Sequence, residues 1–129
     1  MQKLREQHRQ IEALAGRLRA LTAESHPAGN SDLVQVRLAL SVLLRDHLAL
    51  EEELIYAPLR RLGAHAEIIR QSDQELQVMR ETYSQHIRAW PASRVEPQWS
   101  GYGKEVLKLI GATERRIQFE ETQIYPLVA

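Results

Sequence analysis

Residues 33–55, LVQVRLALSVLLRDHLALEEELI, place apolar side chains at spacings of three and four. This period is typical of an α-helix that buries one face, whereas the apolar residues of a half-buried strand alternate. His47 and Glu51 are four residues apart, so they lie on the same face of this helix, one turn from each other. The stretch therefore predicts a long amphipathic helix whose buried face carries a histidine and an acid.

Three other segments have the same helical period, and the breaks between them are short. The predicted helices cover about residues 2 to 24, 31 to 63, 64 to 90 and 97 to 125, with a linker at 91–98. Four long amphipathic helices with short connections predict an all-α fold, an up-down-up-down antiparallel four-helix bundle. A length of 129 residues fits one such domain, covering residues 1–129.

Residues with known boundary preferences mark the ends of these helices. The segment HPAGN, residues 26–30, is a break after the first helix. Ser31 and Asp32 are good N-caps for the second helix, and Gly63 is a plausible C-terminal stop. Pro91 should end the third helix, because proline cannot continue a helical hydrogen-bond ladder.

The composition agrees with a helical fold and excludes several classes of protein. Hydrophobic residues make up 43% of the chain and aromatic residues only 5%, which favours helix over sheet. The 17 basic and 17 acidic residues give no net charge, so we expect no binding to nucleic acid. The absence of cysteine excludes disulfides, thiolate zinc sites and iron–sulfur clusters. No apolar run is long enough to span a membrane and no signal peptide is visible, so we expect a cytoplasmic protein.

Two segments of the sequence resemble each other. HLALEEELIY, residues 47–56, can be aligned with RIQFEETQIY, residues 116–125. Both have paired acids at the fifth and sixth positions and end in Ile-Tyr. This pseudo-repeat predicts two related helical hairpins, in which Glu120 matches Glu51 and Arg116 stands where a second histidine would match His47.

Counting residues from the predicted loops gives the partners of His47 and Glu51. His47 is roughly 16 residues into the second helix, and roughly 16 residues back from the end of the first helix is His8. The same count from Glu51 across the loop near Gly63 reaches Glu75 on the third helix. A buried carboxylate is costly unless it is paired, protonated or bound to a metal, so the sequence predicts a metal site in this layer. The candidate ligands are His8, His47, Glu51, Glu75 and Glu120.

These motifs resemble the hemerythrin-like, cation-binding domain family. The resemblance covers nearly the whole chain and rests on residues 7–11 (QHRQI), 47–56 (HLALEEELIY) and 120–126 (EETQIYP). It implies a four-helix bundle that holds a non-haem di-iron centre through histidines and bridging carboxylates. It also implies a role in reversible oxygen binding, oxygen or redox sensing, iron handling, peroxide chemistry or repair of iron centres, with dioxygen or peroxide as the small-molecule partner.

The chain departs from this family in two places, which leaves several functions open. Arg116 stands where the family usually has a histidine, and no histidine lies within a turn of Glu75. His65 and His86 are each roughly 15 Å along the helix from Glu75, too far to share its site. An inward-pointing Arg116 could itself neutralise Glu51 or Glu120 in place of a metal. The alternatives are therefore a metal-free bundle acting in protein interaction or signalling, and an enzyme of the carboxylate di-iron type, for example one that degrades peroxide.

Two plainer interpretations also apply to individual residues. His47 and Glu51 could be a solvated pair on a polar helix face, because a His and an acid at this spacing often are. Tyr56 and Tyr125 are expected to close the core near one end of the bundle rather than to bind a cofactor.

Overall fold

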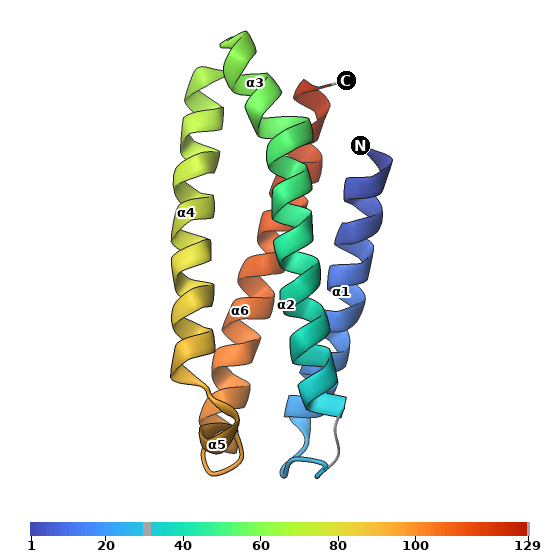
Figure 1. The fold of residues 1–129 in the computed structure, drawn as a ribbon, viewed down its shortest axis with the longest axis vertical. Helices are drawn as coiled ribbons and strands as arrows, with labels where there is room; N and C mark the ends of the chain where they lie inside the picture. The colour runs from blue at the N-terminus through green and yellow to red at the C-terminus, as the bar shows by residue number, and fades with distance from the viewer. Residues whose placement is uncertain (30–31, 129) are drawn as a thin grey trace.

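The computed structural model describes residues 1–29 and 32–128, and most of these residues are helical. The long helices are α1 (Gln2–Ala23), α2 (Asp32–Glu51), α4 (Ala66–Ala89) and α6 (Trp99–Phe119). They lie side by side as a helical bundle, with the start of α1 and the end of the described chain at one end and α5 (Ala92–Val95) at the other (Figure 1). No strand occurs in residues 1–29 and 32–128, so the predicted all-α class is confirmed.

Most of the predicted helix boundaries are confirmed. The helix that starts with α2 continues through a π-helical turn, η1 (Glu52–Tyr56), into α3 (Ala57–Leu62). Gly63 ends it with a φ of 69°, a left-handed conformation that glycine adopts without steric cost, and its N–H donates to the carbonyl of Leu59. The predicted linker at 91–98 is not irregular throughout, because it contains α5. Asn30, in the predicted break, and Ser31, a predicted N-cap, lie outside the described residues.

A second π-helical turn, η2 (Glu120–Ile124), follows α6 and leads into a 3-10 turn, η3 (Tyr125–Leu127). In η1 the N–H of Ala57 donates to the carbonyl five residues earlier, and in η2 the N–H of Tyr125 does the same. A proline lies two residues after each π turn. Proline has no N–H and its ring crowds the carbonyl four residues earlier, which disfavours a regular α-helical ladder there. The sequence repeat therefore corresponds to a repeated local structure.

The apolar side chains form two clusters along the bundle. The larger cluster fills the half near α5 and includes Ile11, Leu18, Val36, Leu40, Tyr102, Val106, Ile110 and Ile117. The smaller cluster fills the half near the chain ends and consists of Leu4, Ile55, Tyr56, Leu59, Ile69, Ile124 and Tyr125. In α1, His8 falls between Leu4 of one cluster and Ile11 of the other. A buried polar layer therefore separates the two clusters.

A glycine lets two of the long helices approach each other closely. A Cβ atom on Gly103 of α6 would lie 3.2 Å from the carbonyl oxygen of Thr22 at the end of α1. The missing side chain thus allows α1 and α6 to meet at the end of the bundle that is remote from the polar layer.

None of the helices in the described part of the chain is both long enough and apolar enough to cross a membrane.

Candidate metal centre

Four of the predicted ligands lie together in the buried polar layer. His8 comes from α1, His47 and Glu51 from α2, and Glu120 from the first residue of η2. All four side chains are buried, and each offers one nitrogen or oxygen atom within 4.8 Å of the others. The rings of His8 and His47 have centroids 4.6 Å apart, which agrees with the equal heights predicted from the sequence. These histidines and acids form a group that could hold a metal ion.

His47 presents an unused nitrogen to this group. Its Nδ1 lies 2.8 Å from the amide oxygen of Gln7. An amide oxygen can only accept a hydrogen bond, so Nδ1 carries the proton and Nε2 keeps a lone pair. Burial, together with the nearby charge of His8, lowers the pKa of His47 to about 4, so the ring is neutral near pH 7. Gln7 therefore orients His47 as an outer partner orients a metal-binding histidine.

The lone pair on Nε2 of His47 faces a carboxylate oxygen, so two hydrogen-bond acceptors point at each other. Nε2 of His47 lies 3.2 Å from Oε2 of Glu51, but it has no hydrogen-bond partner among the described residues. Oε1 of Glu51 is also buried without a partner there. Two acceptors facing each other in a buried site are unfavourable unless a cation or a proton lies between them. The donor set therefore fits a cation: imidazole and carboxylate groups bind iron and other transition metals.

His8 is held on its outer side by a different acid. Its Nδ1 lies 2.6 Å from Oε2 of Glu121, while Nε2 lies 3.4 Å from Oε1 of Glu120. Burial alone lowers the pKa of His8, but the hydrogen bonds with Glu120 and Glu121 outweigh it and raise the pKa above its ordinary value. Burial likewise raises the pKa of Glu120, although His8 opposes the shift. Metal ligands must be deprotonated, so a metal bound here would displace protons from these groups.

Two buried tyrosines donate hydrogen bonds to the two acids, each across the bundle. The hydroxyl of Tyr125 donates to Oε2 of Glu51 at 2.6 Å, and the hydroxyl of Tyr56 donates to Oε2 of Glu120 at 2.8 Å. Each tyrosine lies five residues after the acid of its own segment. In an α-helix, side chains five residues apart lie on different faces. In a π turn, which has more residues per turn, they lie on nearly the same face. The two π turns therefore bring both tyrosines into the polar layer.

Arg116 also points into this layer. Its side chain is buried, and its Nη2 donates to the hydroxyl of Tyr56 at 2.8 Å, to Oγ of Ser72 at 2.9 Å and to Oε2 of Glu120 at 3.3 Å. Its Nη1 donates to the carbonyl of Ser72 at 3.2 Å. The guanidinium thus pairs with Glu120, as one alternative from the sequence anticipated, and no hydrogen bond joins it to Glu51 among the described residues.

The structure does not bring Glu75 into the group. The Glu75 side chain is 52% exposed, and its carboxylate reaches only the edge of the layer, 3.9 Å from Nη1 of Arg116. The fully buried Ser72 occupies the corresponding position on α4. The residue count across Gly63 predicted a position about one turn too far along α4. The reason is that α3 leans toward α4 instead of continuing along the bundle (Figure 1). The chain therefore rises less before it turns, and it returns to the level of the layer one turn earlier in α4.

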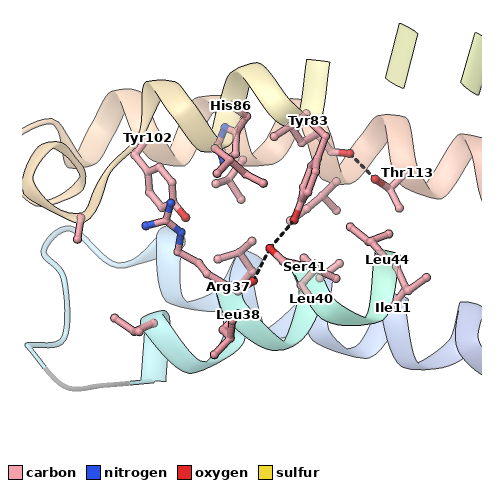
Figure 2. Close-up of a pocket in the computed structure, with 18 residues that line it drawn as sticks. Ile11, Arg37, Leu38, Leu40, Ser41, Leu44, Tyr83, His86, Tyr102 and Thr113 are labelled. Atoms are coloured by element: carbon pink, nitrogen blue, oxygen red, sulfur yellow. Dashed lines mark hydrogen bonds between the residues drawn. The ribbon is translucent and has the colours of Figure 1, made fainter. Parts of the chain in front are cut away.

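Two adjoining cavities lie beside the layer. The first, of about 510 Å³, is lined by His8, His47, Glu51, Arg116 and Glu120 at the layer and by mainly apolar side chains of α2, α4 and α6 elsewhere. The second, of about 260 Å³, lies nearer α5 (Figure 2). Ser41 and Tyr83 line both, and Figure 2 shows the hydroxyl of Tyr83 reaching from α4 to Ser41 on α2, at 3.1 Å. A small molecule therefore has space next to the candidate ligands.

Sequence reasoning did not assign several of the residues that shape the centre to it, namely Gln7, Tyr56, Ser72, Glu121 and Tyr125. The repeat contained a signal for the tyrosines, because they hold the same position in both segments. Gln7 and Glu121 are direct neighbours of predicted ligands, a weaker signal. Ser72 carried no signal in the sequence.

Comparisons with known proteins agree with this geometry. The sequence model of the hemerythrin HHE cation binding domain matches residues 1–128. No curated protein and no solved structure matched the chain. The family match spans essentially the whole chain, including every residue of the buried layer. The chain therefore belongs to the hemerythrin HHE cation-binding domain family.

Proposed function

We propose that this protein binds iron in a non-haem site inside the bundle and acts in oxygen or redox sensing or in iron handling. His8, His47, Glu51 and Glu120 would hold the metal. The proposal takes the fold as one domain with the up-down-up-down arrangement predicted from the sequence, which the course of the ribbon in Figure 1 supports. Iron bound there would supply redox chemistry, while the chain itself supplies the ligands and the surrounding cavity.

One observation carries the proposal. Nε2 of His47 and Oε1 of Glu51 are buried, and neither has a hydrogen-bond partner among the described residues. Buried polar atoms are nearly always satisfied, and a group of such atoms converging on one point is explained by a cation. The neutral state of His47 supports this, because a metal ligand must be deprotonated.

The surroundings support a role with small molecules. The cavity beside the centre has mostly apolar walls formed by α2, α4 and α6, and it ends at the candidate ligands. Such a cavity admits a small molecule to a metal, and dioxygen and peroxide are both small enough to enter it.

Metal analysis of protein expressed with iron supplementation, together with an optical spectrum, tests the proposal. We expect iron to copurify with the protein. His47→Ala should abolish this binding, whereas His65→Ala, at an exposed position before α4, should leave it unchanged. Folding of both variants is checked by circular dichroism. Absence of iron from freshly purified wild-type protein would contradict the proposal, and retained iron in His47→Ala would show that the ligands are wrongly assigned.

A specific observation favours a second candidate, a metal-free bundle acting as an interaction or signalling module. Arg116 and Tyr56 already satisfy Oε2 of Glu120, and Tyr125 donates to Glu51. These bonds would stabilise both acids without a metal. The unsatisfied atoms of His47 and Glu51 favour the metal site over this candidate. The same metal analysis separates the two functions.

A further inference from the structure

We propose that the centre holds one cation and that the guanidinium of Arg116 takes the place of a second one. This inference rests on the proposed metal binding and adds its stoichiometry. It departs from the di-iron centre that the family resemblance implies, because the residues present fit one metal position and not two.

The two halves of the bundle contribute matching residues to the layer. His47 is matched by Arg116, four residues before the acid in each half, and Glu51 is matched by Glu120. His8 is matched by Ser72. The match follows from their contacts, since His8 contacts the tyrosine that follows Glu120 and Ser72 contacts the tyrosine that follows Glu51. One half thus offers two imidazoles, while the other offers a guanidinium and a hydroxyl.

The polar atoms of the second half converge on Arg116. Its Nη2 lies within 3.3 Å of three acceptors: the hydroxyl of Tyr56, Oγ of Ser72 and Oε2 of Glu120. These oxygens are the groups that would surround a cation in this half. The nitrogen that they surround already carries positive charge and donates to all of them. A metal ion could not occupy this place while Arg116 remains there.

The charges in the layer lead to the same conclusion. Glu51 and Glu120 are the only buried acids among the described residues. The guanidinium of Arg116 is a cation, so it balances one of the two carboxylates. One divalent cation then brings the layer beyond neutrality, and a second would add two further charges with no buried acid to balance them.

Titration of the metal-free wild-type protein with Fe(II) under anaerobic conditions, and separately with Co(II), measures the number of cations per chain. We expect one tightly bound ion per chain with either metal. Two ions per chain would overturn this inference and leave the proposed metal binding intact. No bound ion would overturn both, so the two failures are distinguishable.

A pair of variants tests whether Arg116 is the cause. The double variant Ser72→His, Arg116→His gives the second half the same imidazoles as the first, and we expect its stoichiometry to rise from one ion to two. The matched control, Arg115→His, changes an exposed neighbour and should remain at one. A double variant that folds with wild-type helical content but still binds one ion would overturn the assignment to Arg116. If the double variant does not fold, the wild-type stoichiometry still decides whether the second position is available.

Discussion

Removal of the Tyr125 hydroxyl tests how the polar layer is stabilised. Tyr125→Phe keeps the ring, which stacks against His8 with centroids 5.5 Å apart, and deletes the oxygen that donates to Glu51 and lies 3.2 Å from Nε2 of His8. Glu51 already has one carboxyl oxygen without a partner among the described residues, so the variant would leave its buried carboxyl with no hydrogen-bond donor from that part of the chain. The variant therefore tests the bond to Glu51, at 2.6 Å, together with the longer contact of the same hydroxyl with His8, at 3.2 Å.

The size of the effect follows from the chemistry of this bond. A hydrogen bond to a charged group contributes about 1.5–3 kcal/mol, and a buried acceptor that loses its donor is at the upper end of such ranges. We expect metal-free Tyr125→Phe to lose about 2–3 kcal/mol of unfolding free energy. Tyr102→Phe is the matched control, because the Tyr102 hydroxyl is fully buried and has no partner among the described residues. Its removal should change the stability by less than about 1 kcal/mol.

Urea unfolding followed by circular dichroism measures both variants in metal-free protein. Equal losses for Tyr125→Phe and Tyr102→Phe would refute the reasoning, because the bond to Glu51 would then contribute nothing beyond burial of the hydroxyl itself. Iron adds a second test. Tyr125→Phe removes the donor of Glu51, but a cation bound between His47 and Glu51 would replace that donor. The loss of unfolding free energy should therefore be smaller in metal-loaded protein.

Two further outcomes are expected elsewhere in the bundle. Gly16→Ala should stabilise the protein by about 0.5–1 kcal/mol through helix propensity, since nothing lies within 4 Å of its new Cβ. Gly103→Ala should stabilise the protein less, because its Cβ would lie 3.2 Å from a backbone carbonyl oxygen. An equal gain in thermal unfolding would contradict the close approach of α1 and α6. Burial, with a smaller contribution from Arg37, lowers the pKa of His86 although Glu105 opposes the shift, so the unfolded chain binds a proton more readily there. Stability should therefore fall as the pH drops below about 6.5, and less steeply in His86→Gln; identical pH profiles of urea unfolding would exclude this contribution.

Much of the fold could be predicted because its causes are local. Apolar spacing identified the helices, and Gly63 and Pro91 marked helix ends through backbone properties that do not depend on distant contacts. Equal counting from one loop placed His8 level with His47, because α1 and α2 are joined by a short connection and both have a regular rise. Those parts of the centre that depend on straight helices were therefore accessible from the sequence.

The parts that failed depend on departures from regular helix geometry. The residue count led to Glu75 and not to the level of Ser72, because the lean of α3 could not be read from the sequence. Tyr56 and Tyr125 were expected to close the core near one end of the bundle, and both do lie in the core cluster there, but their hydrogen bonds to the acids were not predicted. The π turns that bring them to the acids widen the helix by one residue per turn, and only the prolines that follow hint at this change. The hydrogen bonds that complete the centre thus became visible only in three dimensions.

The crossed tyrosine bonds have a consequence for how the protein unfolds. The acid of each half receives its tyrosine donor from the other half, because Tyr125 serves Glu51 and Tyr56 serves Glu120. Separation of the halves would remove the tyrosine donor from both acids at once, although Arg116 would keep its bond to Glu120 within its own half. Partial opening therefore costs free energy in both halves. Unfolding of either hairpin should accompany unfolding of the other in a single cooperative transition.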